Sequence, residues 1–520
     1  MSPAQASVTP LPQQGGVPIE PDFATFAVLY DTGTPQVAWT RLVADLETPV
    51  SAMLKLAHER PNSFLLESVE GGATRGRYSI IGCEPDLVWR AHGARAEVNR
   101  TPGADPTAFA PSLLPTLQSL RALLAESAIA LPPELPPMAA GIFGYMGYDT
   151  VRLIEHLPAM NPDALGLPDS ILVRPTLILI FDTVRDEMTV VTPVRPVPGV
   201  SAKAAYTRAA DRLNIVIERL DQPLPHVSGL GSEASHPELK PGMTPAAYAE
   251  KVARAKEYIA AGDIFQVVLS QRFEAPFTLP SFSLYRALRR VNPSPFLYYL
   301  NFDGFAVAGS SPEILVRVRN GVVTIRPIAG TRPRGATPEH DKVLAKELLA
   351  DAKERAEHLM LLDLGRNDIG RVAEVGSVRV TDSFFLEYYS QVMHIVSNVE
   401  GQLNPAHDAI DALMAGFPAG TVSGAPKVRA MEIIDELEDG KRGIYAGCVG
   451  YFSANGEMDS CIVLRTSVVK DGTMYVQAGA GVVADSVPER EQAECVSKAS
   501  ALFRAAEEAV RFAARAKRGR

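Results

Sequence analysis

The sequence predicts an α+β fold in which antiparallel sheets are sandwiched between helices. Short apolar runs separated by turns gather in groups, and they do not alternate regularly with helical segments as in a parallel α/β sheet. The stretch GIFGYMGYD (141–149) has glycine at every third position, but no dinucleotide-binding pattern follows it, and the chain has no Walker A motif. With 520 residues, 46% of them hydrophobic, the chain can bury large cores, as two or more domains or as one intertwined unit.

The first strand and helix signals lie in the first 220 residues. Apolar runs bounded by turns predict strands at 63–68, 77–85, 176–184 and 187–194. Helical patterns are found at 40–59 and 203–220.

A polar segment then separates two regions of the chain. From Asp221 to Pro245 the sequence is rich in Pro, Gly, Ser and His and lacks hydrophobic periodicity, which is typical of a linker. Thr244 and Pro245 match the N-cap and first position of a following helix. We expect a disordered tail at 1–20, an N-terminal region at 21–220, a linker at 221–244, a C-terminal region at 245–512 and a basic tail at 513–520.

The C-terminal region contains the stretch GDIFQVVLSQRF (262–273), which has the pattern of a strand. Gln266, Val268 and Ser270 would share one face of it. An uncharged amide among apolar neighbours is unusual, and a core amide bonded to the backbone is its simplest explanation. Further helices are expected at 340–360, 407–415, 427–438 and 487–512.

Composition argues against several kinds of partner and compartment. The net charge is −9 and no long basic run occurs, so nucleic acid is not an expected partner. The four cysteines are scattered without metal-type spacing, which is typical of free thiols in a reducing cytosol. The N-terminus lacks the pattern of a signal peptide, and no apolar run reaches the ~20 residues that span a bilayer.

Two of the expected helices carry paired glutamates. Glu354 and Glu357 lie three residues apart, and Glu491 and Glu494 repeat this spacing. Each pair shares one helix face, and two such pairs can hold one hard cation, with Mg²⁺ keeping some of its waters. A solvated helix face is the alternative for either pair alone.

Three other segments bring cations or glycines to apolar surroundings. The segment RPIAGTRPRG (326–335) combines a Gly-Thr turn with arginines. The segment CIVLRT (461–466) places Arg465 inside an apolar strand, where a buried arginine needs an acidic partner or a bound anion. The strand in MYVQAGAGVVADS (474–486) is expected to bend at 479–481, as an anion cradle or as a plain tight turn. With Lys498 added, the pieces predict a site for a small polycarboxylate.

These segments closely resemble the chorismate-utilising enzymes. The resemblance spans about 245–512 and rests, in order, on RPIAGTRPRG, AEHLMLLDLGRND, PAGTVSGAPKVRAMEIIDELE, GIYAGCVGY, CIVLRT, QAGAGVVADS and PEREQAECVSKA. LLES (65–68) and NPSPF (292–296) resemble the anthranilate synthase large subunits, or component I, within that family. The resemblance implies an N-terminal part packed against a catalytic part.

The resemblance also implies roles for individual residues. It implies a Mg²⁺ cofactor, bound directly by Glu357 and Glu494 and through water by Glu354 and Glu491. Glu313 would be the general acid for the departing 4-hydroxyl of chorismate. His394 would be the acid–base group of the second step, although alone it could be a satisfied strand histidine. The implied chorismate-binding residues are Gly330, Thr331 (also counted as catalytic), Tyr445, Arg465, Gly479, Ala480, Gly481 and Lys498.

Two positions distinguish branches of the family. Members that add water have a lysine at the position of Gln266, and an amide cannot replace that base, so Gln266 indicates amination and opposes a water-adding isomerase. Aminodeoxychorismate synthases commonly have a nucleophilic lysine at the position of Ala329, and alanine lets ammonia attack C2 directly. The implied product is anthranilate, formed after loss of pyruvate in the first step of tryptophan biosynthesis. The alternatives are aminodeoxychorismate synthase component I, and a non-catalytic regulatory subunit that keeps the fold.

Further partners are implied besides chorismate and ammonia. None of the cysteines has the surroundings of an amidotransferase nucleophile, so a separate glutamine amidotransferase, component II, is expected to supply ammonia within a cytoplasmic hetero-oligomer. L-Tryptophan is expected as a feedback inhibitor, although LLES could equally be an edge strand with a polar end. The implied inhibitor-binding residues are Glu67, Ser68, Pro293, Ser294 and Pro295.

Overall fold

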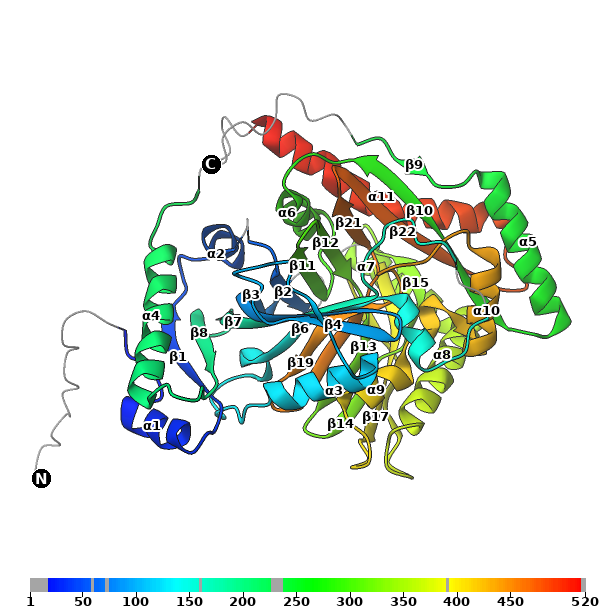
Figure 1. Ribbon diagram of the computed structural model, residues 1–520. Coiled ribbons are helices and arrows are strands. Elements are labelled where there is room, and N and C mark those ends of the chain that lie inside the picture. The colour runs from blue at the N-terminus through cyan, green and yellow to red at the C-terminus, as the bar shows by residue number, and fades with distance from the viewer. Residues whose placement is uncertain are drawn as a thin grey trace, which may run out of the picture.

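The computed structural model describes residues 17–57, 60–70, 74–158, 161–225, 237–389 and 392–515. Strands fill the interior and helices lie over the outer faces (Figure 1). The strand pairs in this part of the chain run antiparallel. The prediction of an α+β fold with antiparallel sheets between helices is therefore confirmed.

The N-terminal region contains eight strands and four α-helices among the described residues. In chain order they are α1 (Phe23–Asp31), β1 (Gln36–Val43), α2 (Pro49–Leu56), β2 (Ser63–Glu70), β3 (Thr74–His92), β4 (Arg95–Asn99), β5 (Ala110–Pro111), α3 (Thr116–Ser127), β6 (Gly141–Met146), β7 (Ser170–Asp182), β8 (Glu187–Val194) and α4 (Ala202–Leu220). Two short 3₁₀ turns, η1 (Pro137–Ala139) and η2 (Tyr148–Leu153), flank β6.

The remaining elements belong to the C-terminal region. They are β9 (Lys240–Pro241), α5 (Pro245–Ala261), β10 (Gln266–Pro276), α6 (Ser281–Val291), β11 (Phe296–Phe302), β12 (Phe305–Ser311), β13 (Ile314–Arg319), β14 (Val322–Ile325), β15 (Ile328–Pro333), α7 (Pro338–Ala350), α8 (Ala352–Gly370), β16 (Arg379–Tyr388), β17 (Val392–Gln402), α9 (Ala409–Gly416), η3 (Gly420–Val422), β18 (Gly424–Ala425), α10 (Lys427–Leu437), β19 (Cys448–Ser453), β20 (Met458–Ile462), β21 (Thr466–Lys470), β22 (Thr473–Val482) and α11 (Pro488–Arg515).

Most of the expected elements are present. The strands predicted at 63–68, 77–85 and 187–194 lie in β2, β3 and β8, and most of 176–184 lies in β7. The helix predicted after the linker begins at Pro245, and the hydroxyl of Thr244 caps it by accepting a hydrogen bond from the Ala247 amide. Of the expected tails and linker, residues 1–16, 226–236 and 516–520 lie outside the described part of the chain.

Two helix predictions are wrong in detail. The helix expected at 40–59 begins only at Pro49, because residues 36–43 form β1 and pair with β8 (Thr40 opposite Val190). The helix expected at 340–360 is divided at Asp351, whose backbone is extended (φ −69°, ψ 112°). The side chain of Asp351 accepts hydrogen bonds from the amides of Lys353 and Glu354, so it caps a new helix.

Strands from the two regions pair with each other. Strand β2 pairs with β11, with Glu67 opposite Leu297, and β6 pairs with β19. Side chains along β2 alternate between two buried clusters, with Phe64 in one and Leu65 in the other. The sheet is therefore covered on both faces, and the N-terminal region packs against the C-terminal one as the family resemblance implied. None of the described helices is long and apolar enough to cross a membrane.

Candidate active site

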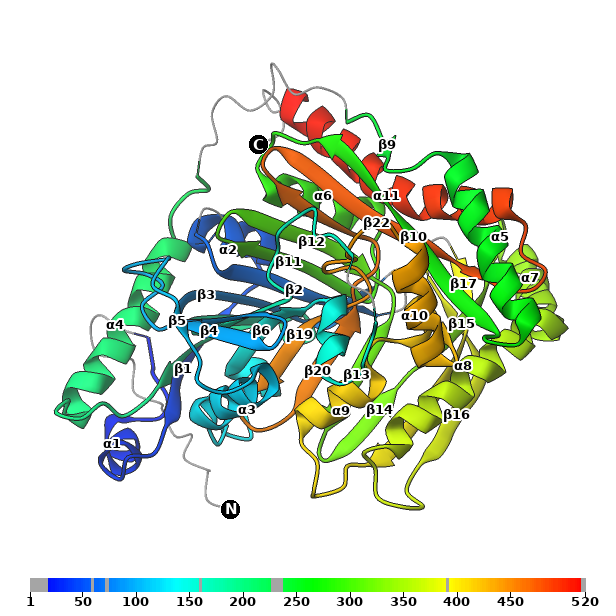
Figure 2. The ribbon, with the colours of Figure 1, turned by 45° about the vertical axis from the view of Figure 1, so that its right-hand side comes forward.

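The predicted site residues converge on one side of the molecule. Strand β10 pairs with β18 and β22, and β15 pairs with β17. Helix α8 packs on β15 and β17, and α11 packs on β22. Figure 2 shows β10, β15, β17, α8 and α10 together on the right-hand side. The glutamate helices and the glycine-bearing strands, distant in sequence, thus border one region.

His394 and Thr331 face each other across β15 and β17. They are partners in the strand register, and the Thr331 hydroxyl lies 3.0 Å from Nδ1 of His394. The register shifts between Ala329 and Thr331, where Gly330 has a left-handed backbone (φ +79°) that glycine adopts without strain. Burial, together with the charge of Arg465, lowers the pKa of His394 to about 4. The imidazole is therefore neutral near pH 7 and able to accept a proton.

Glu313 is a buried carboxyl between β12 and β13. Burial raises its pKa to about 8, although the hydroxyl of Thr421 donates to its two carboxyl oxygens over 3.2 Å and lowers the pKa in part. At neutral pH this side chain keeps its proton, as a general acid must. The role of Thr421 was not predicted, although it stands within the PAGTVSGAPK segment of the family resemblance.

Arg465 does not lie inside a strand as predicted. It lies between β20 and β21 with a left-handed backbone (φ +48°), which interrupts the extended chain. Burial lowers the pKa of its guanidinium, while its proximity to Tyr389 and Glu313 opposes that shift. The guanidinium forms no ion pair with any residue of the described ranges. It is thus a cation placed near the acid and the imidazole and able to bind an anionic ligand.

The bend expected at 479–481 is also wrong. Gly479, Ala480 and Gly481 continue β22 and pair in register with residues 268–270 of β10. A Cβ on Gly479 would lie 2.9 Å from the hydroxyl of Tyr445, and one on Gly481 would lie 2.7 Å from Nε2 of Gln266. Glycine therefore suits both positions: a Cβ on Gly479 would also meet the carbonyl of Leu269 at 2.9 Å, and one on Gly481 would displace the amide of Gln266.

Gln266 begins β10 and is only 4% exposed. Its Nε2 donates to Oε1 of Glu357 over 3.4 Å, and its Oε1 has no hydrogen-bond partner among the described residues. A core amide bonded to the backbone, the simplest explanation from sequence, would not leave this oxygen free. A buried amide oxygen without a partner can accept a hydrogen bond from a ligand.

The four glutamates come from α8 and α11. Burial raises the pKa of Glu357, and the nearby charges of Glu354 and Glu494 raise it further. A bound cation would relieve this repulsion, and the all-oxygen set suits Mg²⁺. Side chains of the described residues do not form a group of three or more acidic, His or Cys ligands in metal-binding geometry. The magnesium site therefore stays a prediction.

Two cations also contact this acidic group. Lys498 lies 2.8 Å from Oε1 of Glu494 and donates to the carbonyl of Gly479 over 2.8 Å. Arg332 pairs with Glu354 at 3.0 Å. Lys498 thus connects α11 to β22, next to the glycines that border Gln266 and Tyr445.

A cavity of about 570 Å³ lies beside Glu67 and Ser68, residues of the predicted inhibitor site. The carboxylate of Glu67 is already satisfied by Arg289 of α6 at 2.6 Å and by the hydroxyl of Tyr285. The three residues 293–295 do not line this cavity, whose wall continues instead through 296–298 of β11. No sequence pattern predicted its charged wall, which contains Arg317, Arg319, Glu457 and Asp459.

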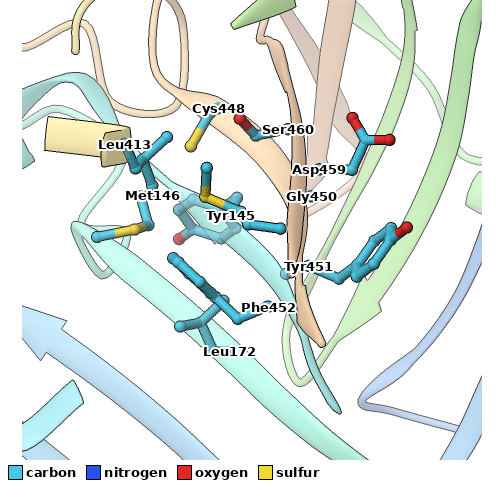
Figure 3. Close-up of a pocket in the computed structure, with 12 residues that line it drawn as sticks. Tyr145, Met146, Leu172, Leu413, Cys448, Gly450, Tyr451, Phe452, Asp459 and Ser460 are labelled. Carbon is cyan, nitrogen blue, oxygen red and sulfur yellow. The ribbon is translucent and has the colours of Figure 1, made fainter. Parts of the chain in front are cut away.

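Strands β19 and β20 form the wall between this cavity and the packed core. Figure 3 shows Phe452, Met146 and Leu172 on one side of these strands, and Tyr451 and Asp459 on the other. The core side leaves a cavity of only about 10 Å³, which has room for one water molecule at most. The larger cavity is therefore the one able to hold a small molecule on these strands.

Comparison with known proteins places this geometry in a family. Residues 65–504 match the family described as chorismate binding enzyme. Anthranilate synthase component 1 of Cereibacter sphaeroides is 57% identical over 497 residues, covering 96% of this chain and 99% of that protein. Its counterpart from Thermus thermophilus is 49% identical over 471 residues, covering 89% of this chain and 96% of that protein.

Solved structures agree with these relatives. The crystal structure of anthranilate synthase component I from Streptococcus pneumoniae covers 89% of this chain and 98% of its own, with a TM-score of 0.73 and 37% identity. The menaquinone-specific isochorismate synthase of Escherichia coli has a TM-score of 0.69 at 19% identity, and it covers 93% of this chain and 100% of its own. The latter likeness concerns the fold alone.

Proposed function

We infer the function from the family: the chain belongs to the chorismate-binding enzymes, within the family of anthranilate synthase component 1. We propose that it aminates chorismate at C2 with ammonia and then eliminates pyruvate to give anthranilate, for tryptophan biosynthesis. The observation that carries this proposal is the buried amide of Gln266, which stands beside Glu357 and whose Oε1 has no hydrogen-bond partner in the described part of the chain. An amide has no proton-accepting group near neutral pH, so it serves a nucleophile that needs no base.

Substrate binding uses the cations and the glycine strand. Arg465 and Lys498 would hold carboxylates of chorismate, and the hydroxyl of Tyr445 points at the space above Gly479. Glu357 and Glu494 would hold Mg²⁺ directly, with Glu354 and Glu491 acting through water. When bound, the ion would neutralise the ring carboxylate of the substrate.

The amination step needs a nucleophile and an acid. Ammonia would donate one N–H to Oε1 of Gln266 and keep its lone pair for C2, where the new C–N bond forms. As the ring electrons shift, the C4–O bond breaks, and Glu313 gives its proton so that the hydroxyl leaves as water. Ala329, buried on β15, leaves no side-chain nucleophile to compete with ammonia.

The elimination step uses the neutral imidazole. His394 would take the C2 proton of the aminated intermediate while the bond to the enolpyruvyl oxygen breaks. The ring becomes aromatic, and pyruvate forms when its methylene carbon gains a proton. The contact with Thr331 at 3.0 Å orients the ring of His394 for this transfer.

Regulation and partnership belong to the same proposal. L-Tryptophan would occupy the cavity of about 570 Å³, whose apolar wall suits an indole. Oδ1 of Asp459 is buried without a partner among the described residues and could accept from the ligand's ammonium. Arg317, which pairs with Asp459 at 3.0 Å, and Arg319, which pairs with Glu457 at 2.8 Å, would turn in part toward the ligand's carboxylate. A glutamine amidotransferase subunit in the cytoplasm would supply the ammonia.

The test is direct. The purified chain is incubated with chorismate, Mg²⁺ and ammonium at alkaline pH, and anthranilate is followed by its blue fluorescence. We expect anthranilate to form in proportion to enzyme. Aminodeoxychorismate as the main product, identified by chromatography, would favour the alternative synthase, and unchanged chorismate would contradict the proposal.

A further inference from the structure

Glu438 and Arg442 form the least exposed ion pair in the described part of the chain, with side chains 4% and 1% exposed. Glu438 follows the last residue of α10, and Arg442 lies in the loop that leads to Tyr445. Two hydrogen bonds join them: Nη2 of Arg442 donates to Oε1 of Glu438 over 2.6 Å, and Nε donates to Oε2 over 2.9 Å. None of the steps proposed above uses this pair.

The remaining donors of Arg442 reach two other segments. Its Nη2 donates to the carbonyl of Val268 in β10, and its Nη1 donates to the carbonyl of Val422 in η3, both over 2.7 Å. The guanidinium also lies 5.5 Å from the ring centre of Tyr445 and 4.8 Å from that of Tyr148. Each guanidinium nitrogen is thus hydrogen-bonded, which offsets the cost of burying the charge.

Glu438 reaches the central strands from the other end of the pair. Its Oε1 accepts from the amide of Ser270 over 2.7 Å and from the Ser270 hydroxyl over 2.8 Å. That hydroxyl accepts in turn from Nε2 of Gln477, in β22, over 2.8 Å. The pair therefore connects β10, β22, η3 and the 442–445 turn, which come together only in the folded chain.

Each connected segment carries a residue of the proposed amination site. Val268 and Ser270 share the strand with Gln266 at alternate positions. Val422 follows Thr421, whose hydroxyl binds the acid Glu313. On β22, Gln477 stands two residues before Gly479. The pair makes no hydrogen bond to β15 or β17, which carry Thr331 and His394.

We propose that Glu438 and Arg442 are positioning residues for the amination step, which hold the amide of Gln266 and the acid Glu313 at a fixed separation around the chorismate site. This inference rests on the function proposed above. A buried ion pair adds little net stability compared with an apolar pair of similar volume, so geometry is the property that it supplies here. Displacing a reacting group by about 1 Å can reduce a rate by about 10²-fold.

The test compares Arg442→Lys and Glu438→Gln with Arg174→Lys. Arg174 is a matched control, because it is buried, forms a multiply bonded pair with Asp86 and Glu126, and lies in the N-terminal region away from the site. We measure ammonium-dependent turnover of chorismate, turnover of supplied aminodeoxyisochorismate, and Tm. We expect the Glu438 and Arg442 variants to lose about 10- to 100-fold in kcat for chorismate, to raise its KM, and to turn over the supplied intermediate at nearly the wild-type rate. Arg174→Lys should lower Tm without changing either rate.

Equal loss of both rates, or a lowered Tm with both rates unchanged, would overturn the inference and leave the pair a purely structural role. If the two variants fail to fold, Ser270→Ala keeps the ion pair and the contact from the Ser270 amide to Glu438, and it removes the hydroxyl that joins Glu438 to Gln477. This variant should lower the amination rate alone, and an unchanged rate would overturn the inference. Wild-type protein that makes no anthranilate would instead overturn the proposed function.

Discussion

Glu313 should make the free energy of unfolding depend on pH, and the substitution Glu313→Gln should remove this contribution. Burial raises the pKa of its carboxyl from 4.5 to about 8, so the folded chain keeps a proton that the unfolded chain releases. Glu313→Gln retains the shape of the side chain and the acceptor for the Thr421 hydroxyl, but it does not titrate. The difference between the two proteins therefore isolates this one proton.

The size and sign of the effect follow from linkage. Because the pKa is higher in the folded state, the stabilisation from the bound proton is full below pH 4.5 and is lost as the pH rises to about 8. That interval is about 3.5 pH units at about 1.4 kcal/mol each, on the order of 5 kcal/mol. Across it, the free energy of unfolding of Glu313→Gln should rise relative to wild type by this amount, and the difference should be constant above about pH 9.

The assay is urea denaturation of both proteins from about pH 4 to about pH 10, with Glu250→Gln, an exposed position on α5, as the control. Other titrating groups are present in both proteins and cancel in the difference. The variant should also lose about 10²- to 10⁴-fold in the amination rate. Parallel stability curves for wild type and Glu313→Gln would refute the assignment of a protonated acid, as would an unchanged amination rate.

Four further predictions concern His394, the magnesium ligands, the inhibitor cavity and the source of ammonia. His394→Ala, or the gentler His394→Met, should let aminodeoxyisochorismate accumulate while anthranilate formation falls about 10²- to 10⁴-fold, as chromatography would show. Unreacted chorismate would mean that His394 serves the first step or the fold. Anthranilate formation at the normal rate would mean that His394 has no part in the reaction. Removal of the metal by a chelator, Glu357→Gln and Glu494→Gln should each abolish turnover, because the ring carboxylate of chorismate would lose its counter-ion. Full activity in chelator-treated protein would rule out the magnesium site. Ser68→Arg should weaken inhibition by tryptophan and leave the KM for chorismate unchanged, because the arginine side chain would fill the cavity beside β2. Equal loss of activity and of inhibition would mean that residues 65–68 have a structural role only. The isolated chain should use ammonium but not glutamine, and equal rates with both would contradict a separate amidotransferase subunit.

Local features of the sequence predicted much of the fold. Alternating apolar residues and turn residues placed β2, β3 and β8, and the Thr-Pro pair at 244–245 placed the start of α5. These signals work because a cap or a strand face depends on residues a few positions apart. Where a segment's partner was distant the prediction failed: Gln36–Val43 is a strand because β8 pairs with it along its whole length.

For the candidate site too, the sequence predicted the local features and missed those that depend on distant residues. The motifs identified the family and the chemical kinds of group, since a carboxylate, an imidazole or an amide is readable at its own position. They did not reveal Thr421 beside Glu313, or the charged wall around Asp459. The local structure predicted for two segments was wrong. Arg465 was expected inside a strand but has a left-handed backbone. The glycines of β22 were expected in a bend but continue the strand, below Tyr445 and Gln266.

The sequence alone thus determined the fold class, the family and the residue types available for catalysis. Only the tertiary structure decided their states: burial keeps Glu313 protonated at neutral pH with a pKa of about 8, and His394 neutral with a pKa of about 4. It also brought Glu438 and Arg442 to the junction of four distant segments. The physical reason is that desolvation and hydrogen bonding depend on which side chains surround a group in space, and those neighbours come from parts of the chain that no local pattern connects.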